Sequence, residues 1–203
     1  MRMLHRRLGV LVTAAGISIG IAAPATAQSA VTERFDGHFR KYSKRFFGPA
    51  FDWPVFKAQG MAESNLQPNA RSWAGARGLM QLMPSTHREV QSKNPDLHVI
   101  RGSIEMNIAA GIAYNRQLWQ LWINDSEHDH LREFMFASYN AGRSTLLRAQ
   151  RLAQEGLLNH RIWSSITLVA PNVPRWRYEE TLSYVDRIFV YLNQMDHGGR
   201  VHP

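Results

Sequence analysis

The sequence has 203 residues, a formal net charge of +8 and no cysteine. Disulfide bonds are therefore excluded, and packing and hydrogen bonds must hold the fold together. The length suits one domain with a good core, and the basic residues are spread along the chain rather than gathered into a run.

The first 27 residues are typical of a secretory signal peptide. Three arginines within residues 1–7 precede the apolar run Leu8 to Ala23, and Pro24 precedes the small-x-small site Ala25 to Ala27. The apolar run is shorter than the roughly 20 residues that span a membrane, which favours cleavage over an uncleaved N-terminal anchor. We therefore expect a soluble periplasmic protein without a membrane anchor. For such a chain we expect no nucleic-acid partner, whereas an anionic cell-wall polymer fits the basic charge.

Residues 28–51 form a lead-in segment, and the first clear helix begins after it. Asp52 is a good N-cap, with Pro54 in the first turn, and Pro68 disfavours helix at the residue before it. One face of this helix is formed by Val55, Ala58, Gln59, Ala62 and Leu66.

Four further segments have helical periodicity, at residues 103–123, 130–142, 144–156 and 178–195. Ser103 is expected to cap the first of these and Gly142 to end the second. The expected buried residues of the first segment are Ile108, Ile112, Leu118, Leu121 and Trp122. No segment is typical of a strand. The sequence predicts a mostly α fold with one domain over residues 52–192 and a flexible tail at 193–203.

Glu63 is the only acidic residue between Asp52 and Glu89. It is expected in the last turn of its helix, where partial burial and the negative end of the helix dipole both raise the pKa of a carboxyl group. A carboxylic acid that stays protonated near neutral pH can act as a general acid. The alternative is an ordinary surface glutamate.

The residues after Glu63 could build a binding loop. Gly75 and Gly78 allow tight turns and close approach to a ligand. In the segment "GLMQLMP", the Gln81 amide and the Met83 thioether suit a sugar ring that carries an N-acetyl group.

Four ordered motifs resemble those of the soluble, SLT-type lytic transglycosylases, a family with a lysozyme-like fold. Glu63-Ser64 and Ser72 precede "GARGLMQ", and the later segments are "NIAAGIAY", "FASYNAG" and "EETLSYV". The resemblance runs from about Asp52 to Leu192. It implies cleavage of the bond between N-acetylmuramic acid and N-acetylglucosamine of peptidoglycan, with formation of a 1,6-anhydro ring.

The resemblance also implies roles for single residues. Glu63 is the catalytic acid and then the base. The expected substrate-binding residues are Ser72, Gln81, Met83, Tyr139, Asn140, Glu180 and Tyr184. No metal and no cofactor is expected, and the partner is the peptidoglycan glycan strand.

Other interpretations of these segments remain open. "YNAG" fits a simple helix end, the Glu180–Tyr184 pair fits an exposed contact, and "EHDH" at 127–130 fits a solvated turn better than a zinc site. At the level of function, one alternative is a hydrolytic lysozyme-like muramidase. Another is a non-catalytic wall-binding or assembly protein. The enzyme could also serve a secretion, conjugation or flagellar machine.

Overall fold

The structure is a computed structural model that describes residues 33–100 and 104–198, so the predicted signal peptide lies outside the described residues. The α-helices are α2 (Asp36–Phe47), α3 (Pro54–Ser64), α4 (Pro84–Lys93), α5 (Ile104–Trp122), α6 (Leu131–Ala141), α7 (Arg143–Glu155), α8 (Trp163–Val169) and α9 (Tyr178–Gly198). The short 3-10 helices are η1 (Pro95–Ile100), η2 (His128–His130) and η3 (Ala170–Asn172). No strand occurs in these two ranges, and the predicted mostly α class is confirmed.

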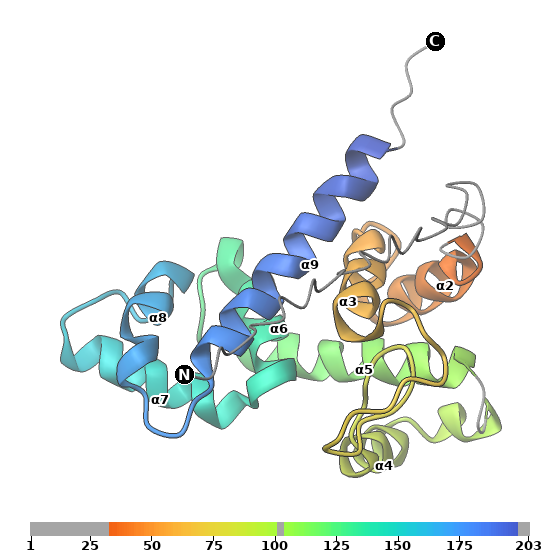
Figure 1. The fold of residues 1–203 in the computed structure, drawn as a ribbon, viewed down its shortest axis with the longest axis horizontal. Coiled ribbons are helices and arrows are strands. Elements are labelled where there is room, and N and C mark those ends of the chain that lie inside the picture. The colour runs from red at the N-terminus through yellow and green to blue at the C-terminus, as the bar shows by residue number, and fades with distance from the viewer. Residues whose placement is uncertain (1–32, 101–103, 199–203) are drawn as a thin grey trace, which may run out of the picture.

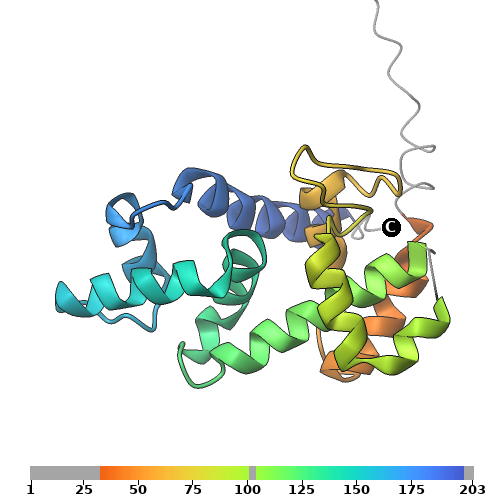
Figure 2. The ribbon, with the colours of Figure 1, turned by 90° about the horizontal axis from the view of Figure 1, so that it is seen from below.

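Helices α5 and α9 connect the two ends of the molecule. In Figures 1 and 2, α7 and α8 lie at one end and α2 and α4 at the other, with α9 crossing between them. Helix α5 has 19 residues and therefore spans about 28 Å. It packs against α2 and α6, while α3 packs against α9. Helix α3, which carries Glu63, is thus held between distant parts of the chain.

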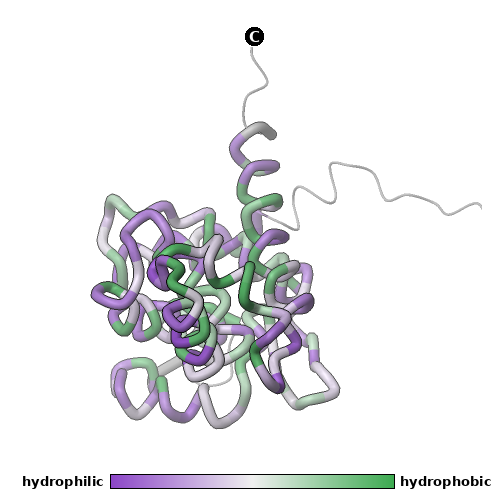
Figure 3. Tube along the Cα trace, turned by 90° about the vertical axis from the view of Figure 1, so that its left-hand side faces the viewer, coloured by the Kyte–Doolittle hydropathy of each residue, from purple (hydrophilic) through white to green (hydrophobic). Residues whose placement is uncertain are grey.

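The core follows the predicted face of α5 with one exception. Ile108, Ile112, Leu118 and Trp122 are buried, but Leu121 is 50% exposed. Leu118 and Trp122 are four residues apart and share the inner face of the helix, which turns Leu121 towards the solvent. Apolar segments run through the body of the molecule, and the last turns of α9 project from it (Figure 3).

The start of α3 differs from the one expected. Helix α3 begins at Pro54 with Trp53 as its N-cap, so the prediction of Asp52 as N-cap was wrong. The Asp52 carboxylate instead lies 3.4 Å from the Arg132 guanidinium of α6. Gly142 ends α6 at φ 81°, as expected. Ser103 lies outside the described residues.

Helices α2, α4 and α8 were not predicted. Helix α2 falls within the lead-in segment, and its Phe39 and Tyr42 side chains are buried. Asp36 of α2 forms a 2.7 Å ion pair with Lys57 of α3. Part of the lead-in segment therefore belongs to the folded body. At the other end of the chain, α9 continues to Gly198 and so includes the first residues assigned to the tail.

None of the described helices combines the length and the apolar character that crossing a bilayer requires.

Candidate active site

Glu63 lies in the last turn of α3, at the point where the chain reverses direction. Asn65 and Leu66 follow with left-handed φ angles of 52° and 58°, and the Leu66 amide returns to the Gly60 carbonyl at 3.3 Å. A Cβ at Gly60 would lie 2.9 Å from the Leu66 side chain, so glycine is what lets Leu66 fold back onto the helix. The helix end is fixed, and with it the position of the Glu63 carboxyl group.

A chain of hydrogen bonds leads from the buried side of α5 to the Glu63 carboxyl group. Asn115 Nδ2 of α5 donates to Gln59 Oε1 at 2.6 Å, and Gln59 Nε2 donates to the Tyr184 hydroxyl at 3.1 Å. The Tyr184 hydroxyl then donates to Glu63 Oε1 at 2.6 Å. Because Gln59 donates a hydrogen bond to the Tyr184 oxygen, the single O–H of the tyrosine is left to point at Glu63.

The surroundings of Glu63 raise its pKa from 4.5 to about 7. Burial is the main cause, because it disfavours the charged form, whereas the Tyr184 hydrogen bond and the Arg187 guanidinium partly oppose the shift. The direction is the one expected from the sequence. Near neutral pH the group can therefore hold a proton and can also release it, as acid–base catalysis requires.

The segment between α3 and α4 forms one wall of the site as a tight loop. The Ser72 hydroxyl accepts a 3.0 Å hydrogen bond from the Ala76 amide, which closes the turn at its tip. Gln81 has a φ of 41°, and its Nε2 donates to the carbonyl oxygens of Ala70 and Gly78 at 3.2 and 2.8 Å. The Gln81 amide nitrogen is therefore committed to the loop, and its Oε1 is the atom left for a ligand.

Asn107 of helix α5 holds this loop in place through two hydrogen bonds. Asn107 Oδ1 accepts from the Met80 amide at 2.8 Å, and Asn107 Nδ2 donates to the Arg77 carbonyl at 2.9 Å. The contact requires glycine at 78, because a Cβ there would lie 2.5 Å from Asn107. Tyr139 donates to the Met80 carbonyl at 2.8 Å, so its hydroxyl supports the loop.

Helices α6 and α9 form the opposite wall. The Thr181 hydroxyl donates to Asn140 Oδ1 at 2.8 Å, which fixes the Asn140 amide. Glu180 is exposed and forms a 2.9 Å ion pair with Arg177. Tyr184 is buried, so the interpretation of Glu180 and Tyr184 as an exposed pair was wrong for Tyr184.

All the predicted site residues line one cleft of about 430 Å³. They are Glu63, Ser72, Gln81, Met83, Tyr139, Asn140, Glu180 and Tyr184. They come from α3, the loop after it, α6 and α9. Segments that are far apart in the sequence thus meet around a single carboxyl group with a raised pKa.

Sequence reasoning missed several residues of this site. Gln59 and Asn115 support Tyr184 from behind, and their only signal was a polar amide within a buried helical face. Trp73, Arg177 and Arg187 also line the cleft. Trp73 is 92% exposed, and an aromatic residue beside two glycine-flanked turns was the available signal.

Residues 47–161 match the family model of the transglycosylase SLT domain, which is more than half of the chain. The chain belongs to this family. The predicted family membership is confirmed, and the matched range contains the loop, α5 and α6, but not α9.

Two comparisons with whole proteins agree with this assignment. The chain is 31% identical over 174 residues to the membrane-bound lytic murein transglycosylase F of Shewanella woodyi, covering 79% of this chain and 35% of that protein. The corresponding protein of Photobacterium profundum is 30% identical, with coverages of 80% and 32%. The chain thus spans about a third of the length of these SLT-family relatives.

Solved structures show the same fold. The 70 kDa soluble lytic transglycosylase of Escherichia coli superposes with a TM-score of 0.56 at 24% identity, covering 85% of this chain and 26% of that one. An inactive mutant of the lytic transglycosylase Slt of Pseudomonas aeruginosa gives a TM-score of 0.60 at 21% identity, with coverages of 81% and 24%. The predicted single SLT-type, lysozyme-like fold is confirmed.

Proposed function

We propose that this chain is a lytic transglycosylase that cleaves the β-1,4 bond between N-acetylmuramic acid and N-acetylglucosamine in peptidoglycan. The observation that carries the proposal is Glu63, whose carboxyl group has a pKa of about 7 and accepts a hydrogen bond from Tyr184 in a cleft of about 430 Å³. Membership of the SLT family and the names of the relatives, all lytic murein transglycosylases, support the same reaction.

In the first step, protonated Glu63 gives its proton to the bridging oxygen, and the bond from this oxygen to the muramyl C1 breaks. The N-acetyl carbonyl oxygen of the same sugar stabilises the positive charge at C1. Glu63, now a carboxylate, takes the proton of the muramyl C6 hydroxyl, and O6 bonds to C1 to close the 1,6-anhydro ring. Glu63 thereby returns to its protonated starting state, and no water is consumed.

A single carboxyl group is sufficient for this sequence of steps. Two-carboxylate glycosidases need a second Asp or Glu across the bond that breaks. Glu180 lines the same cleft, but it is exposed and paired with Arg177. The charged group that shifts the pKa of Glu63 is Arg187, not Glu180. These features favour the one-acid reaction over the two-carboxylate mechanism of many glycosidases.

The other side chains of the cleft would position the substrate and the acid. Tyr184, oriented by Gln59, holds the Glu63 carboxyl group, so that Oε2 is free to carry the proton into the cleft. Gln81 Oε1 and the Met83 side chain would hold the acetamido sugar. Ser72 and Tyr139 act on the loop that presents these two residues.

A peptidoglycan substrate supports a periplasmic location, which the enzyme would reach through the signal peptide expected at residues 1–27. The glycan strand of peptidoglycan is its partner. Its action would serve wall turnover or the opening of a passage for a secretion, conjugation or flagellar assembly.

The test is mass spectrometry of sacculi digested with the purified protein and with Glu63→Gln. We expect 1,6-anhydromuramyl ends from the wild type. Glu63→Gln keeps the size of the side chain but cannot transfer the proton, so release should fall by roughly 10²–10⁴-fold with an unchanged circular dichroism spectrum. Reducing ends in place of anhydro ends would indicate the hydrolytic muramidase. Near-normal release by a folded Glu63→Gln protein would refute the mechanism.

A further inference from the structure

The loop that borders the Glu63 cleft has a second face. Arg77 and Leu82 pair as in an antiparallel ladder, with both backbone hydrogen bonds formed at 3.1 and 3.2 Å. Neighbouring side chains in a ladder point to opposite faces. Gln81 and Met83 accordingly line the Glu63 cleft, whereas Leu82 and Arg77 line a second cavity. The two cavities share this hairpin as a wall.

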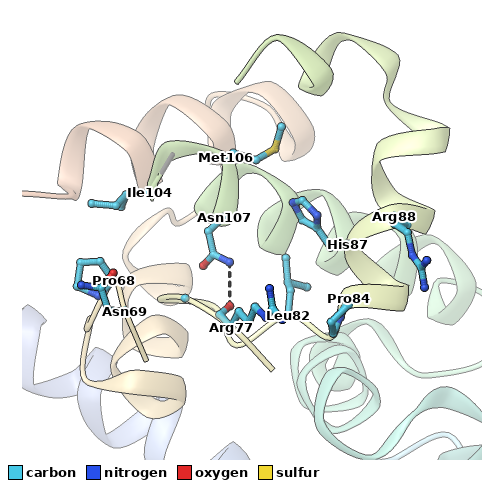
Figure 4. Close-up of a pocket in the computed structure, with 11 residues that line it drawn as sticks. Pro68, Asn69, Arg77, Leu82, Pro84, His87, Arg88, Ile104, Met106 and Asn107 are labelled. Carbon is cyan, nitrogen blue, oxygen red and sulfur yellow. Dashed lines mark hydrogen bonds between the residues drawn. The ribbon is translucent and has the colours of Figure 1, made fainter. Parts of the chain in front are cut away.

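The second cavity, of about 630 Å³, is larger than the Glu63 cleft. Figure 4 shows it between the hairpin, the first turns of α4 and the first turn of α5. The residues that line it are Pro68, Asn69, Arg77, Gly78, Leu82, Pro84, His87, Arg88, Ile104, Met106 and Asn107. The hydrogen bond from Asn107 to the Arg77 carbonyl ties two of its walls together.

Among the described residues that line this cavity, the charged side chains are those of Arg77 and Arg88, and none is a carboxylate. The acids nearest to it in sequence are engaged elsewhere, Glu89 with Lys93 at 2.7 Å and Glu105 with Lys41 at 2.8 Å. Within residues 33–100 and 104–198, neither the Arg77 nor the Arg88 guanidinium forms an ion pair or a hydrogen bond. The cavity can therefore accept an anion without breaking an internal ion pair.

The remainder of the lining is mixed apolar and amide in character. Leu82 and Met106 are buried and form an apolar floor. Burial lowers the pKa of His87, so its ring is neutral at pH 7 and can exchange hydrogen bonds with a peptide backbone. An apolar floor beside two guanidinium groups suits a short peptide with small aliphatic side chains and free carboxylates better than a bare phosphate.

We propose that this second cavity binds the carboxylate-bearing stem peptide of the peptidoglycan strand whose glycan lies in the Glu63 cleft. The proposal rests on the proposed function for the identity of the polymer. The geometry permits it, since a hairpin with its side chains is roughly 10 Å thick, the spacing of stacked sheets. A four-residue peptide extends about 13 Å, enough to pass from one face of the hairpin to the other.

The first experiment compares two substrates, glycan strands with intact tetrapeptide stems and the same strands after an amidase has removed the stems. For the wild type, kcat/KM should be at least about tenfold higher on the peptide-bearing strands. Arg77→Gln and Arg88→Gln should each lower this ratio about threefold, and the double variant about tenfold, because each removes one charge-assisted contact at an exposed site. Arg151→Gln is the matched control, an exposed arginine on α7 outside both cavities, and should leave the ratio unchanged.

The second experiment measures binding without turnover. Free tetrapeptide stem is titrated into the Glu63→Gln protein and followed by NMR, with inorganic phosphate as the competing anion. We expect shifts at Asn107 and His87 that are lost in the Arg77→Gln, Arg88→Gln background. Equal ratios for wild type and double variant would overturn the proposal. So would phosphate binding as tightly as the peptide, since the cavity would then be a general anion site.

The two proposals can fail separately. If the protein released no anhydro ends from either substrate but still bound the tetrapeptide through Arg77 and Arg88, the proposed reaction would be wrong and the peptide site would stand. If it cleaved both substrates equally well, the reaction would stand and the peptide site would be wrong.

Discussion

The charged side chains on the two faces of the hairpin differ in whether they have partners. In the Glu63 cleft the charged groups have partners: Tyr184 donates to Glu63, and Glu180 is paired with Arg177. In the second cavity, Arg77 and Arg88 have no ionic partner among the described residues. A group that transfers a proton needs neighbours that fix its pKa, whereas a group that captures an anion must be left unpaired. The same short hairpin can serve both needs because its side chains alternate between its faces.

After the loss of Glu63 itself, the largest expected effect on the rate comes from loosening the shared wall. Asn107→Ala removes both hydrogen bonds that hold the Met80 amide and the Arg77 carbonyl. A displacement of about 1 Å can cost about 100-fold in rate, so we expect kcat/KM to fall by about 10- to 100-fold. The loss should appear on bare strands as well as on peptide-bearing strands, whereas the arginine variants should affect the peptide-bearing strands alone.

Both substrates are therefore assayed with Asn107→Ala, and circular dichroism checks that it folds. A loss confined to the peptide-bearing strands would show that the hairpin does not couple the two cavities.

The second expected effect concerns the free energy of unfolding. It tests whether the surroundings of Glu63 raise its pKa, in contrast to the unpaired Arg77 and Arg88 on the other face of the hairpin. The pKa of Glu63 is about 7 in the folded state and 4.5 in the reference state. Between these values the folded protein holds a proton that the unfolded chain has lost, so stability falls as pH rises from 4.5 to 7. Above pH 7 the cost is complete, about 1–3 kcal/mol.

Glu63→Gln removes this cost and should be more stable than the wild type at pH 8, but not at pH 4.5. Urea unfolding of both proteins at the two pH values measures the difference. A stability difference that did not change with pH would contradict the raised pKa.

The parts of the fold that sequence could predict are those with a strong local signal. Helix α5 has a continuous apolar face, and Gly142 is a typical helix end. Helix α4 has one buried residue, Val90, and α8 has only seven residues, so neither offers a clear period. Helix α2 and its N-cap place Phe35, Phe39 and Tyr42 at helical spacing, so a local signal was available, but its packing on α5 is contained in no local pattern.

The residues of the site likewise fall into those that the sequence could predict and those that it could not. The motif residues could be named because the family pattern carries them, and their convergence on one cleft agrees with it. Gln59 and Asn115 are 56 residues apart, and their hydrogen bond depends on how α3 and α5 pack. Likewise, Arg77 faces the second cavity only because of its register with Leu82. Contacts set by tertiary packing lie beyond spacing arguments.

A smaller effect is expected when Tyr184 loses its hydroxyl. The Tyr184 hydrogen bond lowers the pKa of Glu63, so Tyr184→Phe should raise that pKa above about 7. The alkaline limb of kcat/KM, where protonated Glu63 is lost, should then move to higher pH. At the optimum we expect about a tenfold lower rate, because the carboxyl group is no longer oriented.

The pH profile separates this role from a merely structural one. Tyr191→Phe is the matched control, on the same helix and outside the cleft, and should leave the profile in place. A profile of Tyr184→Phe that kept the wild-type limb would show that the hydroxyl does not act on Glu63.

The smallest expected effect belongs to Trp73, which sharpens the contrast between a sugar cleft and a peptide cavity. Trp73 lines the Glu63 cleft with 92% of its surface exposed, whereas the described residues that line the second cavity include no Phe, Tyr or Trp. Exposing a large aromatic ring is unfavourable unless a ligand covers it, and the flat face of a sugar can do so. Trp73→Ala should therefore raise KM about three- to tenfold on bare and peptide-bearing strands alike, with little change in kcat, because stacking is the same before and during the reaction. Leu168→Ala, an exposed apolar residue on α8 outside the cleft, is the control and should change neither constant. A fall in kcat without a change in KM would place Trp73 with the groups that act on Glu63 rather than with those that bind the glycan.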